Sequence, residues 1–548
     1  MDLKKLRWIK LALILVIASY FLSAWNEVQE VDPAQYAEIA REMAESNDWL
    51  TLRDNYGPYL DKPPVTIWMI AACFKVFGVS NFAYRLPAIL CAILSIFFLG
   101  RTARILYDRD TAWLSMLIIA SCEAWFLMVG DPKIDMVLVC FLTLCFWAYF
   151  EARTRPRFFY LFYIFIGLAV MTKGPIGFMI PLMAMGMEWF FLRDWKEIWR
   201  MKPISGVVIL AVVIAPWYLV LYQDTGGRGP YFMLWEQSFG RIFIRTFKNQ
   251  ASPFFFVTTF LWAFLPWTSA AIFMIAVKLS EFRKREDKFS YQPRRVLTWW
   301  FVLPFIFISL SSYKLDQYLF WLLPPMAILC ADFIVRAPEY QSRKWFVHFF
   351  RGQNITTVSI VAAAFLTVIF CFPIEKPWLW LVPAFGLLGL LSIAFVKMGP
   401  VKNLAVLPCL AILFFSIVFY LQIYPGALNF QYGTRMGRML KEKDPLGKVV
   451  YSCKIPVSKA LAFYSGRKVE KKDPEQMKSV LSQGRESFVA VREINFQELA
   501  DALGPGCKIE TLGRFPEFHT SRPTIKFLLL KTRPKTLNTV LLLRISPI

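Results

Sequence analysis

The sequence predicts a polytopic α-helical membrane protein with about 13 transmembrane helices and a small soluble α/β domain at its C-terminus. Of the 548 residues, 57% are hydrophobic and only 18% are charged, which is far from the composition of soluble proteins. Apolar stretches long enough to cross a bilayer recur up to about residue 424. Beyond that point charged residues become dense and apolar runs become short. We therefore expect a transmembrane domain over 1–424 and a soluble domain over 425–548.

The first apolar stretch, residues 7–25, follows a basic start. No small-residue cleavage site is evident after it, so we predict an uncleaved anchor whose N-terminus stays in the cytoplasm. Residues 65–77 are too few for a full span and predict a helix lying in the membrane interface. Twelve further spans are predicted at 85–103, 111–129, 134–151, 158–172, 175–192, 204–222, 253–278, 297–312, 315–335, 355–372, 379–396 and 404–424.

Residues 26–64 form the longest polar interruption of the apolar region, and we interpret them as a catalytic loop outside the membrane. Near its start, Asp32 precedes a proline, and a purely structural role as the N-cap of the following helix would be enough to explain this aspartate. The loop ends in Asp61-Lys62 before a Pro-Pro pair that stiffens the chain. An acid and a lysine held on stiff backbone suit a catalytic site, so Asp32, Asp61 and Lys62 are the candidate catalytic residues.

The distribution of basic residues tests the predicted topology. Loops assigned to the cytoplasm hold 27 Lys plus Arg, and those assigned to the outside hold 11 although they are longer in total. This asymmetry is what the positive-inside rule requires. It also accounts for the net charge of +23 without a nucleic-acid partner. An odd number of spans then places both the loop 26–64 and the soluble domain outside, in the periplasm of a bacterium.

The region 425–548 alternates short apolar runs (KVVYS, SFVAV, IKFLLLK) with helix-like stretches at 474–483 and 495–503, the pattern of a small α/β domain. It holds 22 Lys plus Arg against 11 Asp plus Glu. This excess suits contact with an anionic membrane surface, and a solvated basic face explains it equally well. From Lys535 onward no function is evident.

Cysteine and histidine content narrows the chemistry. Of ten cysteines only Cys453 and Cys507 lie in the polar C-terminal region, where a disulfide and two free thiols are equally compatible with the sequence. With only two histidines, His348 and His519, neither a Ser-His-Asp triad nor a multi-histidine metal site is readily built. Carboxylates, lysine, arginine and tyrosine remain for chemistry.

Several ionisable residues fall at the outer ends of predicted spans or in outer loops, where charge is costly unless it is paired. For a single lysine, anchoring in the membrane interface is the better explanation. The whole set faces one compartment, and cations beside carboxylates are what a phosphate-linked sugar donor requires. The set comprises Asp131, Lys133, Asp135, Lys173, Glu236, Arg241, Arg245, Lys314 and Asp316.

Three segments, DPAQYAEIAREM, NDWLTLRDNYGPYLDKPP and FGVSNFAYRLP, resemble in order and spacing the first outer loop of the polyprenyl-phosphate-sugar glycosyltransferases. This is the GT-C superfamily of protein O-mannosyltransferases and the lipid A aminoarabinose transferase. The resemblance implies a GT-C-like fold and a sugar donor carried on a polyprenyl phosphate. The family usually has an acidic residue where this chain has Pro33 and a glutamate where it has Asp61.

Shorter segments extend the resemblance to about residue 325. MTKGP is similar to the family's lysine turn for donor phosphate, which implies that role for Lys173. WEQSFGRIF implies a phosphate-contacting Arg241, and KLDQYLFWLLPP implies a functional Tyr318. DPKIDMVLVCF implies an acidic site residue, either Asp135 or Asp131. Lys314 joins the candidates for donor phosphate, with Tyr36 and Glu236 as further site candidates.

The sequence thus favours a membrane glycosyltransferase that moves a sugar from undecaprenyl phosphate to a lipid A-like or protein acceptor. If a hydroxyl attacks, Asp32 is the expected general base. If a phosphate attacks, Asp32 would orient groups or bind a divalent metal ion with Asp61, although two carboxylates are a weak metal signal. The alternative is a transporter or flippase. Glu123, near the middle of a predicted span, fits that alternative better, whereas the remaining charges lie at span ends.

Overall fold

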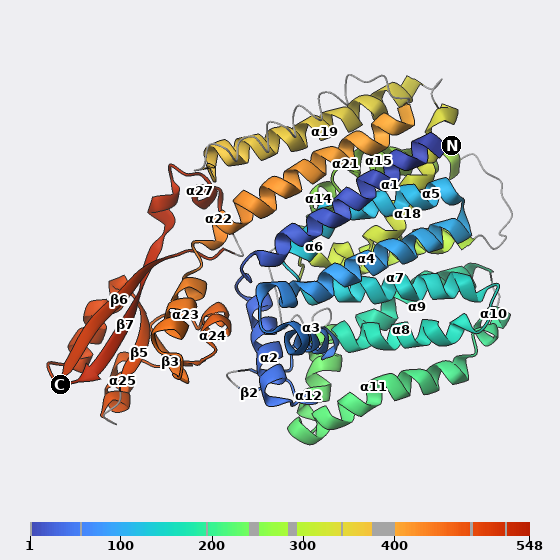
Figure 1. Cartoon of the computed structure of the whole chain (residues 1–548). Coiled ribbons are helices and arrows are strands. Elements are labelled where there is room, and N and C mark those ends of the chain that lie inside the picture. The colour runs from blue at the N-terminus through green and yellow to red at the C-terminus, as the bar shows by residue number, and fades with distance from the viewer. Residues whose placement is uncertain are drawn as a thin grey trace.

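The computed structural model describes residues 3–54, 57–192, 195–240, 251–282, 293–340, 344–374, 400–482, 486–520 and 523–548. A bundle of helices lies side by side, and a sheet-containing unit packs against one end of it (Figure 1). The N-terminus lies near the opposite end of the bundle, and the C-terminus lies at the far side of the sheet unit. Because the first outer-loop helices lie at the sheet-unit end, both polar regions share one side of the bundle.

The bundle consists of straight helices and bent helix pairs. The straight helices are α1 (Leu3–Tyr20), α4 (Asn81–Leu106), α7 (Ile134–Ala152), α8 (Phe158–Lys173), α9 (Ile176–Leu192), α11 (Pro203–Thr225), α16 (Pro293–Leu310), α18 (Leu323–Val335), α19 (Lys344–Phe370) and α21 (Pro400–Val418). The bent pairs are α5 (Arg109–Ala120) with α6 (Glu123–Gly130), and α14 (Phe255–Ala263) with α15 (Thr268–Phe282). Short elements between them are η1 (Phe21–Trp25), α10 (Trp195–Arg200), α12 (Arg228–Tyr231), η2 (Phe232–Gly240), α17 (Gln317–Phe320), η3 (Ala337–Tyr340), η5 (Phe419–Ile423) and α22 (Tyr424–Leu428).

Six helices of the described residues are long and apolar enough to cross a membrane, and eight if each bent pair counts as one span. The chain is therefore a multi-pass membrane protein, but the predicted count of thirteen is not confirmed. The predicted span 253–278 is not one continuous helix, because α14 and α15 meet at 120°. The span 111–129 is bent by 54°, and the predicted span 379–396 lies outside the described residues.

The acidic residue that fitted a transporter lies at one of these bends. Glu123 is the first residue of α6, and its backbone N–H donates to the carbonyl of Leu265 at 2.8 Å, in the connection between α14 and α15. The glutamate thus occupies the break between α5 and α6, where backbone groups leave the helical hydrogen-bond pattern. It does not lie in the middle of a continuous span.

The loop after the first anchor folds into α2 (Asp32–Ser46), a two-strand ribbon of β1 (Arg53–Asp54) and β2 (Gly57–Pro58), and α3 (Val65–Phe77). The predicted 13-residue helix over 65–77 is confirmed as a helix. The capping role considered for Asp32 is not, because Val31 occupies the N-cap position and Asp32 is the first residue of α2. Pro33 follows in the first turn, where its missing N–H costs no hydrogen bond.

The C-terminal unit contains a five-stranded sheet in the order β4-β3-β5-β7-β6. β3 runs parallel to β4 and β5, whereas β7 is antiparallel to β5 and β6. The elements are α23 (Tyr432–Lys443), β3 (Val449–Cys453), α24 (Lys459–Ser465), β4 (Lys468–Lys471), α25 (Pro474–Leu481), β5 (Ser487–Arg492), η6 (Glu493–Asn495), α26 (Phe496–Leu503), β6 (Cys507–Glu517), α27 (Ile525–Leu528), η7 (Arg533–Thr536) and β7 (Asn538–Pro547).

The small α/β character of this region is confirmed, with one difference from the sequence-based expectation. The run IKFLLLK begins as the short helix α27 and is not a strand, because the side chain of Thr524 caps it by accepting from the N–H of Phe527. The last residues form β7 between β5 and β6. Cys453 and Cys507 are both free thiols. They lie on β3 and β6, which two other strands separate, so the disulfide alternative is wrong.

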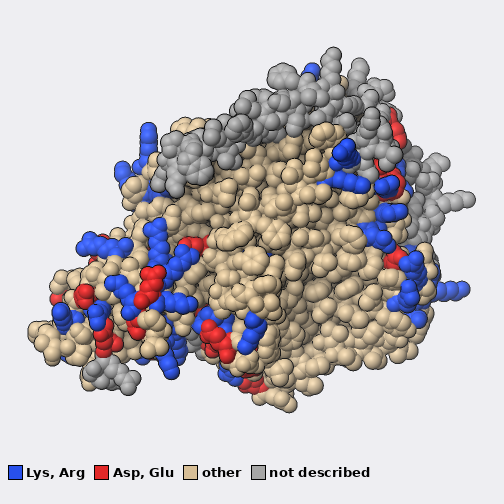
Figure 2. Space-filling view, viewed as in Figure 1, with Lys and Arg blue, Asp and Glu red and all other residues tan. Residues whose placement is uncertain are grey.

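Charged side chains gather at the two ends of the molecule on the face that Figure 2 shows. Between them lies a broad belt of uncharged residues over the helical bundle. Exposed large apolar side chains along α11, such as Val207, Val212 and Leu219, are 61% to 68% exposed. Exposure of such a surface to water is unfavourable, whereas contact with lipid tails is favourable.

Candidate active site

A cavity of about 820 Å³ lies where the first outer loop meets the turns between α6 and α7, α8 and α9, and α16 and α18. Three carboxylates and three lysines line it together with tyrosines and amides. The lining residues are Asp32, Gln35, Tyr36, Tyr59, Asp61, Lys62, Lys133, Ile134, Asp135, Lys173, Gln237, Tyr313, Leu315, Gln317 and Tyr318. Residues separated by almost 300 positions in sequence thus share one polar chamber.

Lys173 and Asp135 form the buried centre of this chamber. The Lys173 ammonium forms an ion pair with the Asp135 carboxylate, and the side chains are 10% and 2% exposed. The indole Nε1–H of Trp321 donates to the same carboxylate at 2.8 Å. The ammonium also lies 4.5 Å from the ring centroid of Trp321 and 4.9 Å from that of Tyr318, within cation–π range. Carboxylate and rings together fix the position of this lysine.

Asp61 and Lys62 enter the chamber from the end of the outer loop. The Gln237 side-chain amide donates to the Asp61 carboxylate at 3.0 Å, while the Lys62 ammonium donates to the Asp61 carbonyl, also at 3.0 Å. The outer loop is thereby tied to η2, the segment after α12. An ammonium has three N–H groups, and this hydrogen bond uses one of them.

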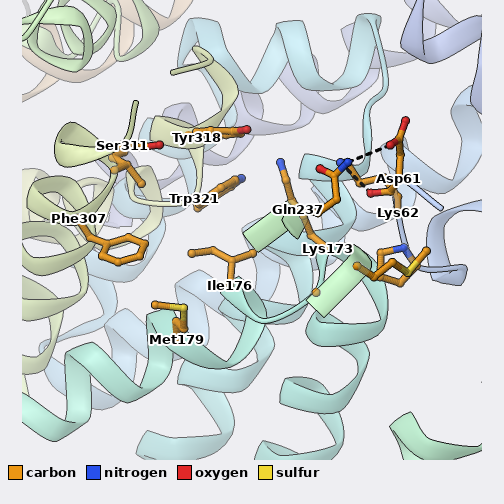
Figure 3. Close-up of a pocket in the computed structure, with 14 residues that line it drawn as sticks. Asp61, Lys62, Lys173, Ile176, Met179, Gln237, Phe307, Ser311, Tyr318 and Trp321 are labelled. Atoms are coloured by element: carbon orange, nitrogen blue, oxygen red, sulfur yellow. Dashed lines mark hydrogen bonds between the residues drawn. The ribbon is translucent and has the colours of Figure 1, made fainter. Parts of the chain in front are cut away.

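A second cavity of about 780 Å³ continues from the first, sharing Asp61, Lys62, Lys173, Gln237 and Tyr318. Its other walls are mostly apolar and include residues of α9, α16 and η2. Figure 3 shows Asp61, Lys62 and Gln237 at one end and Phe307, Ile176 and Met179 at the other. This amphipathic shape matches a molecule with an anionic head and a hydrocarbon tail.

Asp32 also lines the chamber, with an exposed side chain at the first turn of α2. Lys133 contributes the third ammonium, 3.7 Å from the carboxylate of Asp131. Burial by itself lowers the pKa of Lys133, but Asp131, Asp32 and Asp135 outweigh it, so that this pKa is raised. Lys133 therefore stays positively charged beside these aspartates.

Contacts with the C-terminal unit hold the backbone that leads to Asp32. The N–H of Val28 donates to the Tyr464 hydroxyl at 2.7 Å, and its carbonyl accepts from Gln431 at 2.9 Å. The N–H of Glu30 donates to the Gln431 side-chain oxygen at 2.7 Å. The Glu30 carboxylate accepts from the N–H groups of Lys459, at 2.5 Å, and Ala460, at 3.0 Å. We name residues 27–30 the clamped segment.

Arg85 holds the clamped segment from the side of the helical bundle. Its fully buried guanidinium donates to the carbonyls of Glu27 at 2.7 Å, Gly130 at 3.0 Å and Asn26. The adjacent Tyr84 hydroxyl donates to the carbonyl of Pro132 at 2.7 Å. Arg85 and Tyr84 thus tie the approach to Asp32 to the turn that carries Lys133.

The clamp predicts a pH dependence. Removal from water raises the pKa of Glu30 from 4.5 to about 7, and its hydrogen bonds to Ala460, Lys459 and Ser458 oppose this only in part. The folded protein then binds this proton more tightly than the unfolded chain does. The contribution of Glu30 to folding stability is therefore full below pH 4.5 and is lost as the pH rises to about 7. We expect the melting temperature of wild type to fall over this range more steeply than that of Glu30→Gln.

Glu475→Gln, an exposed acid of the same unit, is the matched control and should keep the wild-type slope. Identical slopes for wild type and Glu30→Gln would contradict the assignment.

The structure brings most predicted site residues together, but not all. Asp32, Tyr36, Asp61, Lys62, Asp135, Lys173 and Tyr318 line one chamber. Asp131 lines a neighbouring cavity of about 1100 Å³ that shares Lys133 and Asp135 with the first. Lys314 is buried and donates to the carbonyl of Ser252 at 3.2 Å. Neither Lys314 nor Glu236 is among the residues that line these cavities, although their chain neighbours Tyr313, Leu315 and Gln237 are. Arg241 and Arg245 lie outside the described residues.

Sequence reasoning missed Gln237, Trp321, Tyr59 and Arg85 as site candidates. All four lie inside quoted motifs (WEQSFGRIF, KLDQYLFWLLPP, YLDKPP and AYRLP), so the motifs marked their neighbourhoods. Among the described residues there is no group of three or more His, Cys, Asp or Glu side chains that could hold a metal ion. Asp32 and Asp61 line one chamber, so a cation there would take most of its ligands from water or substrate.

Comparisons with known proteins fit this architecture. Residues 61–219 match the family model described as dolichyl-phosphate-mannose-protein mannosyltransferase. A relative from Proteus mirabilis, named undecaprenyl phosphate-alpha-4-amino-4-deoxy-L-arabinose arabinosyl transferase 2, is 26% identical over 402 residues, 71% of each chain.

Two solved structures share the fold. The crystal structure of ArnT from Cupriavidus metallidurans bound to undecaprenyl phosphate superposes with a TM-score of 0.79 at 18% identity and covers 98% of each chain. An oligosaccharyltransferase from Archaeoglobus fulgidus gives a TM-score of 0.54 at 14% identity, over 92% of this chain and 69% of its own. The architecture is thus shared over nearly the whole length of one solved protein.

Proposed function

We propose that the chain is a glycosyltransferase of the GT-C superfamily and that it transfers a sugar from undecaprenyl phosphate to an acceptor outside the cytoplasm. The observation that carries the proposal is the pair of adjoining cavities, one polar and one amphipathic, that meet at Lys173 and Asp61. A polyprenyl phosphate has both halves: its phosphate suits the lysines, and its chain suits the wall of Phe307, Ile176 and Met179.

In this proposal Lys62 and Lys173 hold the donor phosphate, which leaves when the bond between the anomeric carbon and its oxygen breaks. Fixed cations stabilise the charge that develops on this leaving group. Tyr318 supports Lys173 through its ring, and Asp135 sets the direction of the ammonium. Asp61, held by Gln237, faces the sugar side of the same chamber.

Asp32 then acts on the acceptor. A hydroxyl acceptor forms its bond to the anomeric carbon while its proton passes to the Asp32 carboxylate. A phosphate acceptor needs no base, and Asp32 would orient it instead. The donor named for a relative, undecaprenyl phosphate-linked 4-amino-4-deoxy-L-arabinose, is the first to test, with lipid A and proteins as the two acceptor classes. Mass spectrometry of lipid A and of periplasmic glycoproteins, from cells with and without the gene, separates the two acceptor classes.

If neither lipid A nor any periplasmic glycoprotein changes mass when the gene is removed, the proposed transfer is wrong. Gain of the lost sugar on re-expression of wild type completes the test.

We further propose that residues 1–424 form the transfer domain in the bacterial inner membrane and that residues 425–548 form a periplasmic domain. The clamped segment supports the placement of the outer loop and the C-terminal unit in the same compartment, because Arg438 pairs with Glu27 at 3.0 Å across their interface. A reporter enzyme that works only outside the cytoplasm, fused after residue 440, should be active. The same reporter placed within 101–110 should be silent. Activity of the first fusion only with a cytoplasmic reporter would overturn this orientation.

A further inference from the structure

A short segment of the C-terminal unit exposes apolar side chains where a soluble domain would not. Residues 524–535, named here the interfacial segment, include Ile525 at 76%, Leu529 at 38% and Leu530 at 46% exposure. Exposed apolar residues that cluster within six positions call for a partner, whereas isolated ones do not.

The exposure is not a sign of poor folding, because the opposite side of the segment is well packed. The ring of Phe527 is fully buried and stacks on Phe518 with centroids 3.9 Å apart, and it meets Phe430 edge-on at 5.4 Å. Arg533 folds back to donate to the carbonyls of Phe527 at 2.9 Å and Leu528 at 2.8 Å. A rigid base thus presents the apolar side chains outward.

The segment is joined to the end of a membrane-crossing helix. The N–H of Leu530 donates to the carbonyl of Phe370, the last residue of α19, at 2.9 Å. Arg533 donates to the carbonyl of the next residue, Cys371. Residues 345–370 are long and apolar enough to span a membrane. The depth of the segment is therefore set by this helix end, at the border between hydrocarbon and headgroups.

The end of α19 that contacts the interfacial segment also exposes apolar side chains. In the last turns of the helix, Leu366, Ile369 and Phe370 are 51% to 55% exposed. These side chains face outward at the same end of the helix that Leu530 binds. A single apolar strip thus runs from the span to the C-terminal unit.

Three exposed lysines frame this strip: Lys526, Lys531 and Lys535. A lysine at a membrane border can lay its aliphatic stem on apolar surface while its ammonium reaches the headgroup phosphates. Positive charges near an anionic leaflet add attraction that depends on salt and lipid composition. The arrangement of apolar centre and basic rim is typical of segments that lie in the membrane interface.

We infer that the interfacial segment inserts Ile525, Leu529 and Leu530 into the outer leaflet of the membrane and holds lipid phosphates with its three lysines. This contact sets the height of the C-terminal unit above the bilayer. A second copy of the chain is the other candidate occupant, but continuity with α19 and the basic rim favour lipid. For Lys526, Lys531 and Lys535, this inference favours contact with an anionic membrane surface over a solvated basic face as the reason for the excess of basic residues in the C-terminal unit.

The test places the photo-crosslinking amino acid p-benzoylphenylalanine at Ile525 or Leu530 in the full chain, reconstituted in nanodiscs of phosphatidylethanolamine and phosphatidylglycerol. Matched controls carry it at Ile494 or Leu446, which lie on the same unit and are 87% and 90% exposed. After illumination, mass spectrometry should find lipid adducts at least tenfold more abundant at 525 and 530 than at 494 and 446. Two probe sites guard against one variant that does not fold.

Equal adduct yields at test and control sites, or adducts to a second copy of the chain, would overturn the inference. The lysines are tested by the triple variant Lys526→Gln, Lys531→Gln, Lys535→Gln, which should lower adduct yield in phosphatidylglycerol more than in phosphatidylcholine. Replacement of the exposed Lys471 and Lys478 by glutamine should leave the yield unchanged. If both sets act alike, the basic rim has no specific role.

Discussion

Replacement of Asp32 by asparagine is expected to lower turnover by roughly a hundredfold or more, the scale of general acid–base catalysis, while the protein stays folded. The side chain is exposed to the chamber, is the first residue of α2 and does not occupy the cap position. Loss of a negative charge in the first helical turn costs only about 0.3 to 1 kcal/mol. The melting curve should hardly move while sugar transfer falls.

Glu45→Gln is the matched control, since Glu45 lies on the same helix with a 57% exposed side chain and does not line the chamber. It should transfer sugar at the wild-type rate. Near wild-type transfer by the Asp32→Asn protein would remove Asp32 from the chemistry and leave it only a helix-stabilising charge.

Replacement of Lys173 by methionine is expected to weaken donor binding at least tenfold and also to destabilise the protein. The variant leaves the Asp135 carboxylate buried beside Trp321 without its cation. Removal of one partner of a buried ion pair costs about 3 to 5 kcal/mol. Binding of a fluorescent polyprenyl phosphate and the melting temperature measure the two effects separately.

The double variant Lys173→Met, Asp135→Asn separates the roles of the lysine. It removes both charges and keeps an oxygen that can accept from Trp321, so stability should largely return, because a neutral pair carries no buried charge. Donor affinity should stay low, since no ammonium faces the phosphate. Recovery of donor affinity together with stability would mean that Lys173 serves the fold alone.

The membrane class and the clustering of outer-loop charges could be predicted from sequence because both depend on composition and local motifs. Long apolar runs and basic loops report directly on the bilayer. The span count could not, because an apolar run does not reveal where a helix bends: residues 253–278 read as one span, yet the chain turns by 120° within them. Likewise the apolar run of α27 reads as a strand until the cap by Thr524 is seen.

The site was predictable as a set of charges but not as a set of contacts. Lys173 and Asp135 each stood out as costly charges near a bilayer, while their pairing depends on the packing of α7 against α8. Gln237 and Trp321 are common, uncharged residues whose role comes only from reaching Asp61 and Asp135. Arg85 acts through carbonyl groups, which leave no mark in the sequence.

The most direct test of the account follows one reaction in purified components. Wild-type protein in nanodiscs receives undecaprenyl phosphate-linked 4-amino-4-deoxy-L-arabinose and lipid A, and mass spectrometry measures glycosylated acceptor and released undecaprenyl phosphate. The account predicts that both products appear in equal amounts with wild type and fall about a hundredfold or more with Asp32→Asn. A panel of other undecaprenyl-phosphate sugars and peptide acceptors extends the test. Absence of undecaprenyl phosphate release with every donor and acceptor of the panel would contradict it.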